Sequence, residues 1–346
     1  MSFIEFMEKN MSFTFPNPIA CFKYPHLIPY IWRWQYGRFA RKFSFLPKSY
    51  APFEKYKIND DKTIYNLILD ALENQTPLMM GRYGSGEHNI MQNALLYERG
   101  IISSFGLSFK ELCTNAGFFP YVKSPQDQYV WAKQFLNIML ESTANCDIFG
   151  TWNGHLGFEE YFIKKTKKDL PLFVGYSFFE PHIDAETPFT YALKDRKVLV
   201  IHPFAQTIQE QYKKREKLFA NPKVLPSFDL KTFKAIQTIN GEQDNRFANW
   251  FEALDWMSEE IAKIDFDIAL IACGAYGFPL ASRIKNMGKI AIHCGGPLQL
   301  LFGIKGRRWE IEMPSTGQKL FNEFWVRPNS EETIKNNQNI ENGCYW

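Results

Sequence analysis

The sequence has few of the features that would place it quickly in a class. It holds six cysteines in 346 residues, and none of them forms a CxxC pair. Scattered cysteines are typical of reduced thiols in a cytosolic protein and argue against a disulfide framework or a zinc site. No stretch reaches the roughly 18 consecutive apolar residues of a membrane-spanning helix. The N-terminus lacks a basic segment followed by an apolar one, so we expect no signal peptide.

The net charge is also small. The chain carries 40 Lys and Arg against 37 Asp and Glu, a formal charge of +3. This excess is too weak to indicate a nucleic-acid partner, so we expect none. With 45% apolar and 22% charged residues, the composition is ordinary for a folded soluble protein. Together with the scattered thiols, it leads us to expect a cytoplasmic protein. Its length predicts one large domain with additions, or two domains.

Residues 1–55 differ from the rest in having basic but almost no acidic side chains. Between Lys9 and Phe53 there are seven Lys or Arg and no Asp or Glu, interleaved with Trp, Tyr and Phe. Such a mixture suits a lipid headgroup surface, which would bring residues 9–53 to the inner face of the membrane. The alternative is an arm that wraps the main domain and keeps its charges solvated.

A strand, a glycine turn, a helix and a second strand follow one another after residue 265. Ile268–Ala272 is an apolar run of strand length, and the turn Gly274–Gly277 closes it. Pro279 suits the first turn of the helix that follows, and 289–293 forms the second strand. Strands joined in this way are parallel. The glycine turns after both strands place backbone N–H groups at the carboxyl edge of a sheet, where open α/β folds bind ligands.

The same alternation predicts the fold class. Further strands are expected at 78–80, 146–149 and 197–201, and helices begin near residues 61, 87, 125, 205 and 243. We predict a Rossmann-like, doubly wound α/β domain with a mainly parallel sheet and helices on both faces. It would span residues 56–327, between a basic aromatic arm (1–55) and a polar tail (328–346).

The segment PLMMGRYGSGE combines a short strand, a glycine-rich turn and the start of a helix. Backbone N–H groups and a helix dipole converge at such a turn, which favours phosphate. Arg82 can hold a phosphate through two parallel hydrogen bonds, and Glu87 can bind a divalent cation or a sugar hydroxyl. The alternative is a plain structural ion pair between the two side chains.

This element resembles the RFGDGE element of the GT-D-type glycosyltransferases, a Rossmann-like family. In that family the element binds the diphosphate of a nucleotide sugar and its metal, through an Asp-x-Glu pair. Arg82, Gly84, Gly86 and Glu87 match the element, and Tyr83 replaces Phe. Ser85 stands where the family has Asp, which puts a role for Mn²⁺ or Mg²⁺ in doubt and leaves Glu87 as the metal-ligand candidate. The segments HPFAQTI, CGAYGFPLA and GGPLQLLFGIKGRRW are similar to bacterial proteins found among surface-polysaccharide genes, so the resemblance covers about residues 60–310.

Other candidate residues lie at predicted strand ends and in loops. His202 and His293 each close a strand, so they are candidates for phosphate contact or general base catalysis, although either alone is also typical of a structural histidine. A loop with Trp152, Asn153 and His155 could hold an acceptor sugar, or Trp152 could simply anchor it. The polar residues of 175–191 form either a metal cluster or, more commonly, a surface loop.

These observations give one preferred function and two alternatives. We expect a glycosyltransferase that moves a sugar from a nucleotide-diphosphate donor to a glycan or lipid-linked acceptor in bacterial surface polysaccharide biosynthesis, with Glu87, His202 or His293 as the base. The predicted donor-binding residues are Arg82, Tyr83, Gly84, Ser85, Gly86, Gly274, Tyr276, Gly277, Gly295, Gly296, Lys305, Arg307 and Arg308. The alternatives are a nucleotide-sugar or sugar-phosphate modifying enzyme and a non-catalytic nucleotide-binding scaffold, which the change to Ser85 favours.

Overall fold

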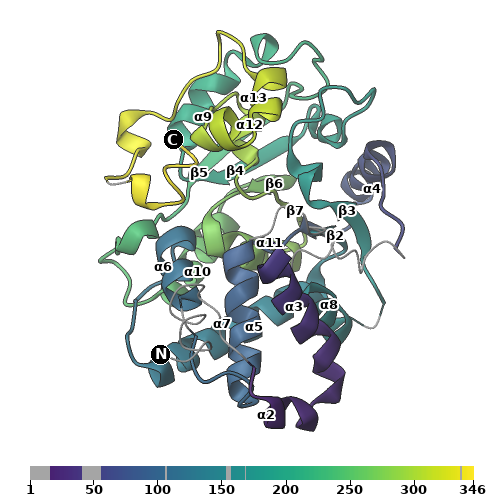
Figure 1. Cartoon of the computed structure of the whole chain (residues 1–346). Coiled ribbons are helices and arrows are strands. Elements are labelled where there is room, and N and C mark those ends of the chain that lie inside the picture. Colours follow the sequence, from purple (N-terminus) through teal and green to yellow (C-terminus); the bar gives the residue numbers. More distant parts are fainter. Residues whose placement is uncertain (1–15, 41–55, 106, 153–156, 168, 336) are drawn as a thin grey trace.

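A single parallel sheet organises the part of the chain that the structure describes. The computed structural model describes residues 16–40, 56–105, 107–152, 157–167, 169–335 and 337–346. Within these ranges, seven strands form one sheet in the order β3-β2-β1-β7-β6-β4-β5, and every neighbouring pair is parallel (Figure 1). The predicted doubly wound, parallel α/β fold is confirmed.

The strands are short and most of them are buried. Their bounds are β1 Leu78–Gly81, β2 Ile148–Thr151, β3 Leu172–Gly175, β4 Lys197–His202, β5 Asp229–Lys234, β6 Ile268–Ile271 and β7 Ile290–His293. The α-helices are α2 Pro18–Lys23, α3 Ile28–Ala40, α4 Asp61–Glu73, α5 Ser85–Glu98, α6 Ser108–Ala116, α7 Pro125–Asn145, α8 Glu159–Thr166, α9 Ala205–Tyr212, α10 Trp250–Ala262, α11 Gly277–Asn286, α12 Leu298–Leu301 and α13 Pro314–Leu320. None of the described helices is long and apolar enough to cross a membrane.

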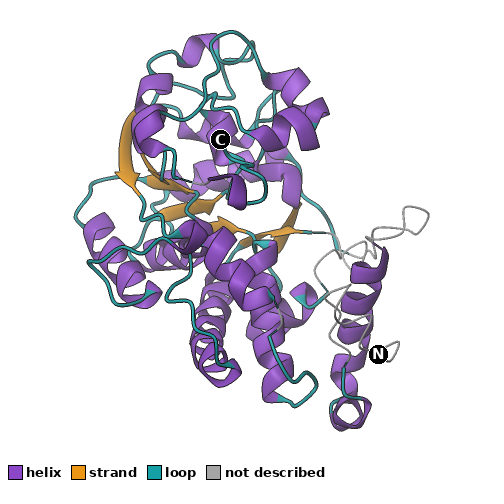
Figure 2. Ribbon diagram, turned by 60° about the vertical axis from the view of Figure 1, so that its left-hand side comes forward, coloured by secondary structure: helices purple, strands orange, loops and turns teal. Residues whose placement is uncertain are grey.

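The two faces of the sheet bury two separate hydrophobic cores. Successive strand residues point to opposite faces, so Met79 packs in one core and its neighbour Met80 in the other. The first core is covered by α5, α6, α7, α8, α10 and α11, and the second by α4, α9, α12 and α13. Figure 2 shows the strands between these two layers of helices. The continuous apolar character of β4 and β6 follows from burial on both faces.

Side-chain caps explain where several helices begin. Asp60 accepts a hydrogen bond from the Thr63 N–H at the start of α4, and Ser124 caps α7 ahead of Pro125. The prediction that a helix begins at residue 243 is wrong. The Asn249 side chain accepts from the N–H groups of Phe251 and Glu252, so α10 begins at Trp250.

The order of the strands creates a crevice in the middle of the sheet. β1 and β7 lie side by side, but α5, which follows β1, covers one face, whereas α12, which follows β7, covers the other. The loops after two such strands diverge and leave an opening at their carboxyl ends. This switch point positions the candidate site.

The two ends of the described chain pack on different parts of the body. Near the N-terminus, Arg33 of α3 forms an ion pair with Glu160 of α8 at 2.8 Å. Near the C-terminus, Trp346 packs against Phe204, with ring centroids 5.9 Å apart. The Glu332 carboxylate accepts hydrogen bonds from the first N–H groups of α9. Residues 328–346 therefore contribute contacts to the α/β body.

Candidate functional site

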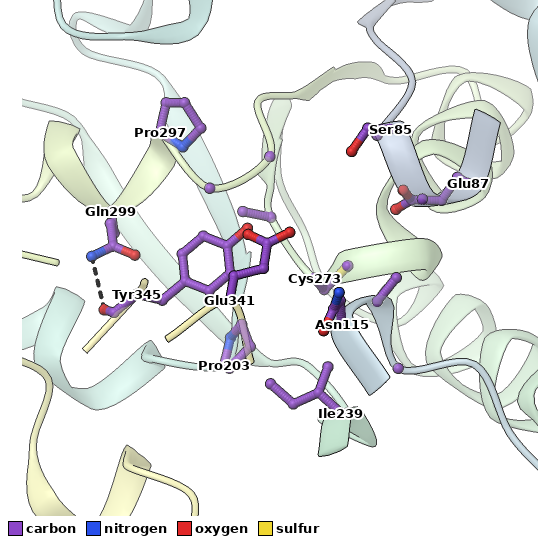
Figure 3. A pocket seen from close by; sticks show the side chains of 18 of the residues that line it. Ser85, Glu87, Asn115, Pro203, Ile239, Cys273, Pro297, Gln299, Glu341 and Tyr345 are labelled. Carbon is purple, nitrogen blue, oxygen red and sulfur yellow. Dashed lines mark hydrogen bonds between the residues drawn. The ribbon is translucent and has the colours of Figure 1, made fainter. Parts of the chain in front are cut away.

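A cavity of about 630 Å³ opens at the carboxyl edge of the sheet. It is lined by residues that end or follow five of the strands: Arg82 after β1, Trp152 after β2, His202 at the end of β4, Gly274 after β6 and His293 at the end of β7. Figure 3 shows Ser85 and Glu87 on one side of this cavity and Gln299 and Tyr345 on the other. Residues from distant parts of the sequence therefore meet at the switch point.

The RYGSGE turn contributes its polar residues to the cavity and its aromatic residue to the core. Arg82, Gly84, Ser85, Gly86 and Glu87 all line the cavity. Tyr83 does not, because adjacent residues of an extended segment point to opposite sides. Its ring is fully buried against Phe149 and Phe278, and its hydroxyl lies 2.5 Å from the Thr143 hydroxyl. The assignment of Tyr83 to donor binding is therefore corrected to a core role.

The Arg82 guanidinium faces the cavity without a carboxylate partner. Its Nη1 donates to the Tyr83 carbonyl at 3.2 Å, its Cζ lies 5.3 Å from the centroid of the Trp152 ring, and its Nε has no partner. It forms no ion pair with Glu87 or with any other carboxylate that the structure describes. Gly295, at φ +67°, lies so close that a Cβ there would stand 2.7 Å from Nη2. The structural ion pair considered from the sequence is absent.

The buried carboxyl group of Glu159 does not neutralise the positive charge of Arg82. Glu159 is fully buried and accepts hydrogen bonds from the Thr151 hydroxyl at 2.9 Å and the Trp152 N–H at 3.2 Å. Burial raises the pKa of Glu159 to about 8, against the lowering effects of these hydrogen bonds and of Arg82. Glu159 is therefore mainly protonated at pH 7 and does not neutralise Arg82.

Glu87 lies in the first turn of α5, over the backbone of Gly84. A Cβ at position 84 would stand 2.0 Å from a Glu87 carboxylate oxygen, so a larger residue there would displace the Glu87 carboxylate. Burial raises the pKa of Glu87, while Arg82 lowers it and Glu341 raises it further. A carboxylate with a raised pKa in a cavity is suited to accept a proton near neutral pH.

The two predicted histidines line the cavity in their neutral form. Burial lowers the pKa of each to about 3, and Arg82 adds to the effect at His293. The Nδ1 atom of His202 accepts from the Phe204 N–H at 2.9 Å, which places its proton on Nε2. The Nδ1 atom of His293 is buried without a partner. Gly277 packs against the His293 ring and does not line the cavity.

The predicted acceptor loop is described only at its beginning. Trp152 lines the cavity, stacks on Tyr176 with centroids 5.1 Å apart, and donates its indole N–H to the Tyr83 carbonyl at 2.8 Å. Asn153 and His155 lie outside the described residues. Tyr276 also lines the cavity, but its ring is buried against Trp250.

Only one member of the predicted basic cluster reaches the cavity. Arg308 lines it. Lys305 instead lies with its Nζ 5.6 Å from the centroid of the Phe321 ring, and Arg307 forms an ion pair with Glu312 at 3.6 Å. The cavity also contains residues that the sequence did not single out, chiefly Asn115, Glu341 and Tyr345.

No group of three His, Cys, Asp or Glu suited to a metal occurs among the residues that the structure describes. The potential oxygen donors in the cavity include Ser85, Glu87 and Glu341, and Glu341 is already paired with Arg308. In the loop at 175–191, His182 pairs with Asp61 at 2.6 Å.

Comparison with known proteins identifies the domain. A family model described as a GT-D fold-like domain matches residues 59–301. One solved structure, a highly conserved domain of unknown function (1792) described as having a distinct glycosyltransferase fold, matches at 13% identity with a TM-score of 0.33, covering 79% of this chain and 96% of its own. A selenomethionine form of such a domain matches at 14% identity with a TM-score of 0.31 and the same coverage. No curated protein matches. The family match spans well over half of the sequence, and the chain belongs to the GT-D-like family.

Proposed function

We propose that the protein is a glycosyltransferase that takes its sugar from a nucleotide-diphosphate donor. Membership of the GT-D-like family supports a glycosyltransferase-type function. The main support for a nucleotide-diphosphate donor is the Arg82 guanidinium. This group faces the cavity of about 630 Å³ and has no carboxylate partner. A buried cation without a partner is costly, and an anionic ligand would remove that cost.

The first turn of α5 would bind the donor together with Arg82. The N–H groups of Ser85, Gly86 and Glu87 precede the first intrahelical hydrogen bond, and all three residues line the cavity. Such a helix end favours a phosphate group. A diphosphate held there gains negative charge as the sugar leaves, and Arg82 would stabilise that charge in the transition state. Fixed cationic side chains would then serve where related enzymes use a metal ion.

Glu87 is the proposed general base. Its carboxylate would take the proton of the acceptor hydroxyl as the oxygen attacks the sugar. The new bond joins the acceptor oxygen to the anomeric carbon, and the bond to the diphosphate breaks with its electron pair on the leaving group. His202, neutral and protonated on Nε2, is placed in the same cavity as a hydrogen-bond donor.

The acceptor is proposed to be a glycan or a lipid-linked intermediate of bacterial surface polysaccharide synthesis. Exposed apolar side chains on α2 and α3 support a membrane-bound acceptor: Phe22 is 79% exposed, Ile19 73% and Trp32 54%. They lie in the 9–53 segment, which has seven basic and no acidic residues. An anionic lipid surface complements both features.

A vesicle experiment tests the membrane contact separately from the chemistry. Wild-type protein should sediment with vesicles of mixed zwitterionic and anionic lipid, and less so as salt rises. The variant Phe22→Ser/Trp32→Ser should lose that binding, whereas the control Leu107→Ser, at an exposed apolar position of the α/β domain, should keep it. Equal vesicle binding by all three proteins would exclude the proposed membrane contact.

Nucleotide binding is the first test of the proposed function. Thermal unfolding would be followed with UDP, GDP, CMP and dTDP, each with and without Mn²⁺. A ligand at about 100 times its Kd adds about 2.7 kcal/mol of stability, which gives a clear shift in Tm. We expect a metal-independent shift with one nucleotide, lost in Arg82→Ala and kept in the surface control Arg246→Ala. No shift with any nucleotide would overturn the proposal.

A non-catalytic scaffold is the second candidate, because Ser85 removes one carboxylate of the family element. It predicts nucleotide binding without sugar transfer. Release of nucleoside diphosphate from the matching donor, at a rate that Glu87→Gln abolishes, would exclude it.

A further inference from the structure

The C-terminal segment, residues 337–346, forms one wall of the candidate donor cavity. Glu341 and Tyr345 line the cavity together with Arg82 and Glu87. In Figure 3 the Glu341 and Tyr345 side chains project into it from the side opposite Ser85. This wall lies outside residues 59–301, the range that the family model matches.

The charge of Arg308 is already engaged by this segment. Arg308 forms an ion pair with the Glu341 carboxylate, and its Cζ lies 5.0 Å from the centroid of the Tyr345 ring. Its Nη1 also donates to the Tyr345 hydroxyl at 3.5 Å. Arg82 and Arg308 line the same cavity, yet only Arg308 is paired with a carboxylate.

Backbone contacts hold the segment against the body, and a sharp turn presents Glu341. The Arg308 N–H donates to the Cys344 carbonyl at 3.0 Å, and the Gln299 side chain donates to the Tyr345 carbonyl at 3.1 Å. Residues 341–343 have φ values of +44°, +58° and +74°. Glu341 is neither glycine nor asparagine, so the left-handed region is unfavourable for it. The turn therefore holds Glu341 in a strained backbone conformation.

We propose that Glu341 is a built-in competitor for the anionic group of the donor, and that its carboxylate occupies Arg308 until a diphosphate displaces it. The inference rests on the proposed function, because it assumes an anionic donor in this cavity. A diphosphate carries more negative charge than one carboxylate and can reach Arg82 and Arg308 together. When it takes Arg308, Glu341 leaves the cavity and the 341–343 turn relaxes.

The test measures the affinity of inorganic pyrophosphate and of UDP, GDP and dTDP by calorimetry. Glu341→Gln should bind pyrophosphate about fivefold more tightly than wild type, and the gain should shrink as salt rises. The control Glu312→Gln should show no gain, because Glu312 also approaches Arg308, at 4.0 Å, but does not line the cavity. In the Arg308→Gln background, Glu341→Gln should have no effect, which a double-mutant cycle would show.

The outcomes separate this inference from the proposed function. Equal or weaker pyrophosphate binding by Glu341→Gln, with normal binding by wild type, overturns the competitor and leaves the donor site intact. Binding by Glu341→Gln but not by wild type supports the competitor in its strongest form. No binding by any folded variant overturns both, and unchanged Tm values would establish that the variants are folded.

Discussion

The two arginines of the cavity, Arg82 and Arg308, differ in what surrounds them. Arg82 lies within the family-matched range, has no carboxylate partner and is backed by Glu159, which is mainly protonated at pH 7. Arg308 lies beyond that range and is paired with Glu341. The first charge is kept available for a ligand, whereas the second is available only after a competing group has moved. Arg82 would select the anionic ligand, and Arg308 would control its access to the cavity. These two roles need different surroundings.

Glu87→Gln gives the largest expected effect. It tests whether the general base lies on the side of the cavity that holds Arg82. We expect kcat to fall by about 10²–10⁴, the usual contribution of a general base, with little change in donor Kd. Because burial raises the pKa of Glu87, the acidic limb of the wild-type kcat profile should lie above the ordinary value of 4.5. A control is Glu98→Gln at the other end of α5, where the carboxylate pairs with Lys133. An unchanged kcat in Glu87→Gln would move the base to another residue.

Glu159→Gln tests the claim that a protonated carboxyl group lies behind Arg82. The folded-state pKa, about 8, lies above the ordinary value of 4.5, so the unfolded state loses its proton first. The wild type therefore loses stability as pH rises from about 4.5 to 8, and the variant lacks this loss. Relative to wild type, the variant should gain on the order of 4 kcal/mol between pH 5 and pH 9. Denaturant unfolding measures this difference, and a pH-independent one would show that Glu159 is ionised throughout.

Arg82→Ala and Arg308→Ala should affect nucleotide affinity unequally. Loss of Arg82 removes charge-assisted hydrogen bonds to phosphate and should raise Kd about 100-fold. Loss of Arg308 should raise Kd less than about fivefold, because that arginine must first be released from Glu341. Calorimetry with the nucleotide identified by thermal unfolding measures the Kd of both variants. Equal increases in Kd would mean that Arg82 and Arg308 contribute equally to nucleotide binding.

Ser85→Asp sharpens the comparison with the family element. It restores the carboxylate that RFGDGE has, next to Glu87. We expect Mn²⁺ to strengthen nucleotide binding about tenfold in this variant and to have little effect in wild type. The matched control is Ser85→Asn, which has the same shape without the charge. Strong Mn²⁺ dependence in the wild type would contradict the proposed metal-free site.

Local patterns in the sequence were enough to predict most of the α/β alternation. Apolar runs ended by glycine or histidine predicted β1, β4, β6 and β7, and the expected helix starts near residues 61 and 125 agree with those of α4 and α7. The strand β5 was not predicted, because this edge strand is mostly polar (DLKTFK) and has neither an apolar run nor a strict alternation of polar and apolar residues. The strand β3, at the opposite edge of the sheet, was not predicted either, although its apolar run Leu172–Val174 is as long as that of β1.

The candidate site was predicted on the side formed by strand ends and missed on the other side. Arg82, Glu87, His202 and His293 line one cavity because carboxyl ends of parallel strands meet at one edge. The contribution of Glu341 was not predicted, because the polar composition of residues 328–343 indicates little to bury. Its position depends on a long-range ion pair with Arg308 and on a local turn, neither of which leaves a periodic pattern.

The outer position of β5 has a consequence for how the molecule behaves when crowded. An edge strand offers unpaired backbone groups to any other chain, which makes it a starting point for aggregation. Lys231 and Lys234 lie on this strand, and the Lys231 ammonium donates to the Asp265 carbonyl at 2.7 Å. A second molecule that extended the sheet here would bring two like-charged strands together. The same polar residues that concealed β5 in the sequence therefore protect the folded protein from forming intermolecular sheets.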